Sequence, residues 1–355
     1  MEVNHKWVVL LQELLARPIQ GEVRDALRIS DVAPIGGDFS DKAGLSIKDF
    51  FPNGSKNEVV PILGYGRHNL MALVYARERN LPIVLCEDSF LRAATVFRDD
   101  TALPIMRQSV SLTCDTHGFY FDATGQSDIE RMIQTEEIGE SEREKANALI
   151  KTITELKLTK YNNQSTICPV LQGAKSEKVL VIDQDFGDTS TLLGMADESC
   201  FAEMLMAAAD ENPNADVLVK THPDSLVKNG RAGYYSKLSD SDRIYKICFP
   251  VNPYSILEKV SKVYVATSAF GFEALLAGKP VSVFGMPWYA GWGVTDDRQH
   301  CPRRTKQRTL AELFYAFYVK YTKYANPKSR KPCDISKAID VLAQMRTDYW
   351  KNHIC

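Results

Sequence analysis

Several apolar segments of the chain end in residues that could bind or transfer a charged group. In VKTHPD, an apolar run is followed by Lys220, His222 and Pro223. A cationic lysine and a histidine at a strand end can hold a phosphate or protonate a leaving oxygen, and the proline ends the strand. A plain exit from strand to turn has the same pattern, so that alternative stays open.

Thr267 and Ser268 precede the short apolar segment GFEALLAG, which we expect to be a helix. The first turn of a helix offers unpaired N–H groups and the positive end of the helix dipole, which suit a phosphate. Glu273 falls in this turn and is a candidate acceptor for ribose hydroxyls. Alternatively, Ser268 only caps the helix and Glu273 only interacts with its dipole.

Three carboxylates lie in DQDFGDTS, which follows another apolar run. Asp183 and Asp185 flank Gln184 in a D-x-D arrangement that could bind Mg²⁺ with a diphosphate sugar. Such short matches are common by chance, and we expect no metal site. Asp188 lies farther past the strand and is better placed to project into a cleft.

A pair of carboxylates, Glu87 and Asp88, ends the apolar run in LPIVLCED. Two neighbouring carboxylates can raise the pKa of one of them and so supply a general base. Alternatively, Asp88 or Ser89 caps a helix that follows.

The first half of the chain alternates strand and helix patterns, which indicates a parallel sheet. We expect strands at 59–63 and 81–88, a helix at 69–80, a hairpin over 109–123 around His117, two helical segments within 127–160 and an interdomain linker at 157–177.

The alternation restarts after this linker. We expect strands at 178–184, 215–224, 262–268 and 279–285, helices at 201–211, 254–260 and 271–278, and amphipathic helices at 309–324 and 334–350. This pattern predicts two doubly wound α/β domains, 1–165 and 176–300, followed by C-terminal helices at 301–355. Ligands of such sheets bind beyond the carboxyl ends of the strands, where the polar residues above are expected to meet.

Composition limits the class of protein. The 355 residues carry a net charge of −2, and we expect no nucleic-acid partner. No stretch approaches about 18 uninterrupted apolar residues, and the N-terminal segment lacks the pattern of a signal peptide. Eight widely spaced cysteines without a CxxC pair predict neither zinc nor disulfides, and favour a cytoplasmic location.

Charge is concentrated in one segment. Between His300 and Pro332, nine basic residues oppose only Glu312, a net charge of +8. The segment from Arg303 to Lys331 is either a solvated helical face or a surface for an anionic membrane or glycan.

Taken together, these segments resemble the bacterial capsule polysaccharide β-Kdo transferases, the KpsC-like family. The resemblance covers roughly 64–340 and rests on the following stretches, in the family's order: EDSFLRA, SLTCDTHGFYFDA, LTKYN, VLVIDQDFGDTS, VLVKTHPD, VATSAFGFEALLAGKPVSVFGMPWYAGWGVTDDR, PRRT and YANPKSRKPCDISKAID. Ser89 stands where the family usually has glycine, and the chain has one module where large capsule enzymes often have two.

The resemblance implies a GT-B-like glycosyltransferase with a central cleft between two Rossmann-like domains. It implies transfer of Kdo from CMP-β-Kdo to a glycan or glycolipid acceptor, with retention, through a covalent Kdo–enzyme intermediate and without a metal. Capsule or lipopolysaccharide synthesis would place such an enzyme in the cytoplasm, peripherally at the inner membrane. The alternatives are a CMP-sialic acid or UDP-sugar transferase of the same fold, and a non-catalytic partner in glycan assembly.

The resemblance also assigns roles to residues. Asp188 is the candidate nucleophile, with Asp185 as the fallback, and Glu87 or Asp88 is the base for the acceptor hydroxyl. The donor-binding candidates are Gln184, Lys220, His222, Pro223, Thr267, Ser268 and Glu273, with Arg92 and Arg67 as cations for the Kdo carboxylate. Trp288, Tyr289 and Trp292, in the loop 287–293, would form an aromatic platform over sugar or acceptor.

Overall fold

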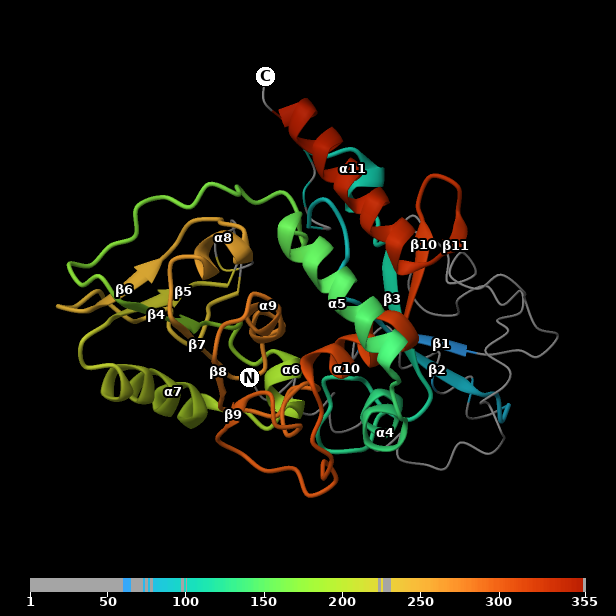
Figure 1. The fold of residues 1–355 in the computed structure, drawn as a ribbon, viewed down its shortest axis with the longest axis horizontal. Helices are drawn as coiled ribbons and strands as arrows, with labels where there is room; N and C mark the ends of the chain where they lie inside the picture. The colour runs from blue at the N-terminus through green and yellow to red at the C-terminus, as the bar shows by residue number, and fades with distance from the viewer. Residues whose placement is uncertain are drawn as a thin grey trace.

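The computed structural model describes residues 60–64, 73, 76, 79–96, 99, 101–222, 225 and 231–353. They form two sheets with helices around them, and the α/β, GT-B-like fold class predicted from the sequence is confirmed (Figure 1).

The second half of the chain forms a six-stranded sheet in the order β6-β5-β4-β7-β8-β9, and all its neighbouring strands are parallel. Its strands are β4 (Lys178–Ile182), β5 (Asp216–Lys220), β6 (Ile244–Ile247), β7 (Lys262–Val265), β8 (Val281–Val283) and β9 (Asp296–Asp297). The chain runs outward from β4 to β6 and then returns to β7, beside β4. The carboxyl ends of β4 and β7 are therefore the topological switch point, where ligands of such sheets bind.

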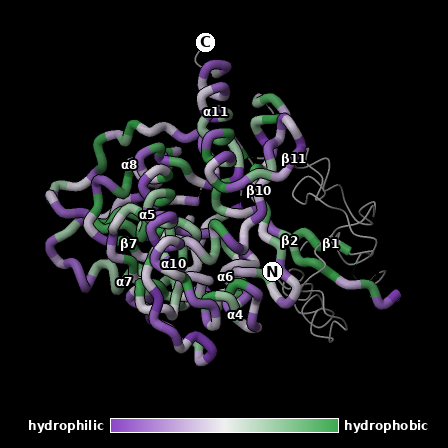
Figure 2. Tube along the Cα trace, turned by 45° about the vertical axis from the view of Figure 1, so that its right-hand side comes forward, coloured by the Kyte–Doolittle hydropathy of each residue, from purple (hydrophilic) through white to green (hydrophobic). Residues whose placement is uncertain are grey.

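Helices cover both faces of this sheet. Alternate residues of β4 and β5, such as Val179 and Val217, pack against α7 (Glu198–Glu211). The intervening residues, such as Leu180, join a second cluster with α8 (Pro253–Leu257) and α9 (Phe270–Leu276). Because both faces are covered, the inner strands β4, β5, β7 and β8 are largely apolar, and Figure 2 shows hydrophobic segments gathered in this region.

The first sheet is mixed, with the order β1-β2-β3-β10-β11. Its strands are β1 (Val60–Leu63), β2 (Ile83–Asp88), β3 (Ser111–Asp115), β10 (Thr322–Asn326) and β11 (Lys331–Cys333). β1 and β2 are parallel, as predicted, and the other neighbours are antiparallel. Of the helix predicted at 69–80, the structure describes only Leu73 and Ala76 as helical, both buried.

The hairpin predicted over 109–123 is wrong. The Asp115 carboxylate accepts hydrogen bonds from the backbone N–H groups of His117 and Gly118, at 2.8 and 2.9 Å, and these bonds turn the chain out of the strand. β3 pairs instead with β2 and, on its other edge, with β10. The aromatic residues that follow pack inward, and Tyr120 is buried.

The helix predicted at 309–324 is helical through Tyr321, but its last three predicted residues belong to a strand. α10 (Leu310–Phe314) continues as the π-helical segment η5 (Tyr315–Tyr321) and then becomes β10. The segment 301–355 therefore contributes strands to the first sheet as well as helices. Thr322, at the start of β10, pairs with Thr113 of β3. The two residues are far apart in the sequence, so local sequence patterns do not predict this pairing.

The remaining helices surround the first sheet. They are η3 (Pro104–Arg107), α4 (Asp128–Thr135), α5 (Glu140–Glu155) and α11 (Ile335–His353), and α6 (Thr189–Leu193) follows β4. No helix in the described part of the chain combines the length and apolarity needed to span a bilayer.

Candidate active site

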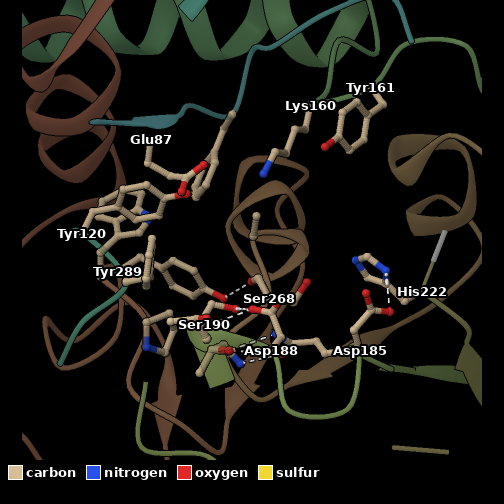
Figure 3. Close-up of a pocket in the computed structure, with 18 of the residues that line it drawn as sticks. Glu87, Tyr120, Lys160, Tyr161, Asp185, Asp188, Ser190, His222, Ser268 and Tyr289 are labelled. Atoms are coloured by element: carbon tan, nitrogen blue, oxygen red, sulfur yellow. Dashed lines mark hydrogen bonds and ion pairs between the residues drawn. The ribbon is translucent and has the colours of Figure 1, made fainter. Parts of the chain in front are cut away.

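A pocket of about 430 Å³ lies between the two halves of the chain, at the switch point of the second sheet. Figure 3 shows its side chains converging from loops of both halves. The first half and the predicted linker contribute Glu87, Phe90, Tyr120, Phe121, Lys160 and Tyr161, and the second half contributes Gln184, Asp185, Asp188, Thr189, Ser190, His222, Arg231, Thr267, Ser268, Ala269, Pro287, Trp288 and Tyr289.

Gln184 and Thr267 join the ends of β4 and β7 at the pocket floor. The Gln184 Nε2 atom donates to the Thr267 hydroxyl at 3.0 Å, and its Oε1 atom accepts from the Thr267 backbone N–H at 2.9 Å. Both residues are at least nine-tenths buried. They therefore fix the spacing of the two strand ends that carry the other polar groups.

Asp188 caps helix α6 and faces the pocket. Its Oδ1 atom accepts from the Ser190 backbone N–H and hydroxyl, at 2.8 and 2.6 Å. Its Oδ2 atom lies 4.0 Å from the Arg231 guanidinium. The side chain is 36% exposed, so one oxygen orients the carboxylate while the other is accessible from the pocket.

Asp185 and His222 form a second pair on the pocket wall. The His222 Nδ1 atom lies 3.1 Å from the Asp185 Oδ1 atom, which also accepts from Ser225 at 3.2 Å. Burial alone would raise the pKa of Asp185, but the hydrogen bond and charge of His222 hold that pKa below its ordinary value. Asp185 thus orients the His222 ring; Pro223, the next residue, lies outside the described residues.

Glu87 ends β2 and lines the opposite side of the pocket. Removal from water raises its pKa to about 7, and the charges of Asp88 and Asp188 add to this rise. Asp188 and Glu87 both line the pocket, and the negative charge of Asp188 raises the pKa of Glu87. Glu87 can therefore exchange a proton near neutral pH.

Asp88 and Arg92 do not line the pocket. The Arg92 Nε atom lies 2.5 Å from the Asp88 Oδ2 atom, and the arginine is 5% exposed. The Asp88 carboxylate, an alternative candidate for the base, and the Arg92 guanidinium, the candidate partner of a sugar carboxylate, thus bind each other. Both expectations are therefore corrected, and Arg67 lies outside the described residues.

Lys160 and Tyr161 line the pocket, although their polar, turn-rich sequence predicts a linker. Asn162 donates to the backbone carbonyls of Ala93 and Thr159, at 2.9 and 2.8 Å, and so holds the segment against the end of the first sheet. The stretch LTKYN carried part of the family resemblance, and this was the signal that could have identified it.

Glu273 and Lys220 lie behind the pocket, and their expected contacts with the donor are corrected. The Glu273 carboxylate accepts from the Thr159 hydroxyl and from the Lys160 backbone, and only 7% of the residue is exposed. Burial raises the pKa of Glu273 to about 7 and lowers that of Lys220 to about 8, although each charge favours the other. Glu273 joins α9 to the segment 159–160.

The aromatic platform expected from the loop 287–293 is also corrected. Trp292 is fully buried and does not line the pocket, while Trp288 and Tyr289 form part of its wall with at most 3% exposure. Trp288 stacks on Phe317, with ring centroids 4.2 Å apart. These aromatic rings therefore pack against apolar side chains of the C-terminal segment, and their faces are not open to a sugar.

Ser268 lines the pocket at the start of α9. Its hydroxyl accepts from the Phe270 backbone N–H at 3.2 Å, and its carbonyl accepts from the Tyr289 hydroxyl at 2.6 Å. Tyr289 therefore links the loop 287–293 to the position expected to meet a phosphate.

One cluster in the described part of the chain has the composition of a metal site: Asp115, His117 and Asp128. Internal hydrogen bonds already use its oxygens. Asp115 Oδ2, for example, accepts from Tyr321 and from the Asp128 backbone, at 2.9 and 2.8 Å. Asp183 of the D-x-D stretch accepts from the Tyr235 backbone, whereas Asp185 binds His222, so these two carboxylates do not converge.

The basic segment between Arg303 and Lys331 is largely paired with the acidic helix α4 and the residues just after it. Arg303 and Arg304 both contact Glu130, and further contacts join Lys306 and Arg308 to Glu137 and Lys320 to Glu136. Lys328 and Arg330, in the turn between β10 and β11, and Lys331, at the start of β11, are exposed. A membrane-binding role stays a prediction for this turn alone.

The chain matches the model of the family described as "Capsule polysaccharide biosynthesis protein" over residues 62–326. Curated relatives include the capsule polysaccharide modification protein LipA of Neisseria meningitidis serogroup A, 37% identical over 83% of this chain and 42% of LipA. Another is the lipopolysaccharide-processing protein LpsZ of Rhizobium meliloti, 36% identical over 76% of this chain and 60% of LpsZ. The chain thus spans less than two thirds of the length of these relatives.

Solved structures from Thermosulfurimonas dismutans KpsC also match. The structure named as its β-Kdo 2,4 transferase is 37% identical, with a TM-score of 0.73, and the match covers 80% of this chain and 86% of that one. The structure named as its β-Kdo 2,7 transferase is 26% identical, with a TM-score of 0.59 and coverage of 82% and 86%.

Proposed function

Because the chain belongs to the family of capsule polysaccharide biosynthesis proteins, we propose that it is a retaining glycosyltransferase, which transfers Kdo from CMP-β-Kdo to a hydroxyl of a surface glycan or glycolipid. Two similar structures are named as β-Kdo transferases, which supports the sugar. The observation that carries the mechanism is the pair of carboxylates, Asp188 and Glu87, in one pocket.

Asp188 has the position of a nucleophile. Its Oδ1 atom is fixed by Ser190, whereas its Oδ2 atom lies 4.0 Å from the Arg231 guanidinium. In the first step, this carboxylate attacks the anomeric carbon of Kdo, the bond from that carbon to the phosphate oxygen breaks, and CMP leaves with the bonding electrons. The product is a Kdo ester of Asp188 with inverted configuration.

Asp185 is less suited to this attack. One of its oxygens is engaged by His222 and Ser225, and the residue is 5% exposed. We assign it the role of orienting His222, whose second ring nitrogen would hold the CMP phosphate together with the Ser268 hydroxyl.

Glu87 has the position and the proton affinity of the general base. In the second step, it removes the proton from the acceptor hydroxyl, the acceptor oxygen attacks the anomeric carbon, and the Asp188 carboxylate is released. Two inversions give net retention. Esterification removes the charge of Asp188, one of the influences that raise the pKa of Glu87, and therefore favours the basic form when it is needed.

We propose that the transfer needs no divalent ion and occurs at the cytoplasmic face of the inner membrane. The leaving group is a nucleoside monophosphate, and Lys160, His222 and Arg231 line the pocket as protein cations. Turnover that persists in excess EDTA would support the first point, and its loss with recovery on adding Mg²⁺ would refute it.

The deciding experiment is intact-protein mass spectrometry after incubation with CMP-Kdo generated in situ. We expect one added Kdo mass on the wild type and on Glu87→Gln, and none on Asp188→Asn. Asp185→Asn should retain the adduct at a reduced rate, since Asp185 contacts His222 and Ser225 and is not the proposed nucleophile.

An adduct on Asp188→Asn that is lost in Asp185→Asn would move the nucleophile to Asp185. CMP release without any adduct would replace double displacement by front-face or inverting chemistry. Neither release nor adduct would refute the donor, and stabilisation by UDP instead of CMP would then identify a different sugar nucleotide.

A further inference from the structure

We propose that Lys160 is the residue that recognises the carboxylate of the donor sugar, and that it makes the site specific for nucleotide-linked sugar acids. This inference rests on the proposed function, because it concerns the donor of that reaction. It begins from a requirement of the substrate: the anomeric carbon of Kdo carries a carboxylate as well as the phosphate, so the pocket must accommodate two anions.

Only three cationic side chains line the pocket among the residues that the structure describes: Lys160, His222 and Arg231. Two basic residues near the pocket are excluded by their contacts. Arg92 is buried against Asp88, and Lys220 lies behind the pocket, near Glu273.

His222 and Arg231 are already associated with carboxylates of the second half of the chain. His222 lies 3.1 Å from Asp185, and Arg231 lies 4.0 Å from Asp188. Lys160 has no such ion pair with any residue in the described ranges. Among the described residues its ammonium is thus the pocket cation without an ion pair within 4.0 Å, although the charges of Glu87 and Asp88 act on it.

The direction of the side chain agrees with this role. Figure 3 shows Lys160 reaching into the pocket from the side opposite Asp188, with Glu87 on one flank and His222 on the other. An anomeric carbon above Asp188 with its phosphate toward His222 would direct its remaining anionic substituent toward Lys160.

The charge of Lys160 is maintained despite its partial burial. Burial would lower its pKa, but the ionisable groups around it, Tyr161, Tyr120, Asp88 and Glu87, raise the pKa above its ordinary value. The ammonium thus stays protonated near neutral pH, and it attracts a carboxylate in a partly desolvated site.

Both halves of the chain hold the backbone of this residue in place. Asn162 ties the segment to Ala93 in the first half, and Glu273 of α9 accepts from Thr159 and from the Lys160 backbone. Two anchors on a short segment leave the lysine little freedom except along its side chain, which suits a specificity contact.

The test compares donor and nucleotide. Lys160→Met should raise the KM for CMP-Kdo about tenfold to a hundredfold, as expected for loss of a charged hydrogen bond, and leave kcat much less affected. The Kd for CMP alone, measured by calorimetry, should change by less than about twofold, because CMP has no sugar carboxylate. Lys160→Arg should recover part of the KM.

Lys157→Met is the matched control. Lys157 belongs to the same segment but binds Glu258 and Ser255 outside the pocket, at 2.7 and 3.2 Å, so its change should leave both constants as in the wild type. This control removes any general effect of substituting a lysine in the segment.

Two results would overturn the assignment of Lys160 while the proposed function stands. One is an unchanged KM for CMP-Kdo in Lys160→Met, with the wild type forming its adduct. The other is an equal weakening of CMP and CMP-Kdo, which would assign Lys160 to the phosphate. A wild type that neither releases CMP nor forms an adduct would refute the proposed function, and the role of Lys160 with it.

Discussion

The Arg304–Glu130 pair joins the loop 287–293 to helix α4, and its removal should destabilise the protein strongly. The Arg304 Nε atom lies 3.0 Å from the Glu130 Oε2 atom, with both side chains 2% exposed. Its Nη1 atom donates to the carbonyls of Pro287 and Ala290, at 2.6 and 2.8 Å. Arg304→Met keeps the apolar stem but removes all three contacts.

The structure sets the size of this effect. Breaking a buried ion pair by removing one partner costs about 3–5 kcal/mol, chiefly because a charge is left unpaired. Glu130 would keep one partner, since the Arg303 Nε atom lies 2.6 Å from its Oε1 atom. We therefore expect the lower end, a loss of about 3 kcal/mol in the free energy of unfolding.

Urea unfolding followed by tryptophan fluorescence measures this loss, because Trp288 and Trp292 are buried next to the pair. Lys306→Met is the control. Lys306 comes from the same segment and forms a 3.5 Å ion pair with Glu137, just after α4. In this pair the Lys306 side chain is 49% exposed and the Glu137 side chain is 80% exposed. It should contribute less than about 1 kcal/mol. Equal, small losses for both variants would refute the view that Arg304 fixes the pocket loop.

Two further predictions concern pH and the membrane. The pKa of about 7 for Glu87 predicts that turnover falls about tenfold per pH unit below pH 7 as the base becomes protonated. Glu87→Gln should lose this fall in rate at acidic pH, along with most of the rate. A fall in rate at acidic pH that persists in the variant would assign the titration to another group. At low salt, replacing Lys328 and Lys331 by alanine should reduce pelleting with anionic vesicles, because both are exposed where β10 turns into β11. Lys306→Ala should not reduce it; the opposite order would place the contact on the α4 side.

The four inner strands of the second half, β4, β5, β7 and β8, were predictable because they are continuous apolar runs separated by helical segments, whereas the edge strands β6 and β9 are more polar and were not predicted. Strands covered on both faces must be apolar throughout, so the residues at which each run ends are easily located. Gln184, Asp188, His222 and Ser268 were identified in this way, and the structure brings them to one pocket.

The first half was less predictable because its sheet depends on contacts between distant segments. β10 pairs with β3 across about two hundred residues, and the π-helical segment before it has the apolar pattern of an ordinary helix. Local sequence could not indicate where that helix pattern ends. Lys160 was missed for a related reason: its segment is polar and irregular, and only Glu273 and Asn162 determine where it lies.

The aromatic residues of the loop 287–293 explain why the pocket has a defined shape without an exposed platform. The ring of Phe90, in the first half, stacks on that of Phe317, with centroids 5.0 Å apart. Phe317 in turn stacks on Trp288 of the second half. All three rings are nearly inaccessible to water, so moving the two halves apart would expose several large apolar surfaces at once. The interface therefore resists opening on this side, which favours a constant separation between the carboxylates of Asp188 and Glu87. The two-step transfer that we propose would need this constancy, because an ester on Asp188 would have to stay within reach of an acceptor activated by Glu87.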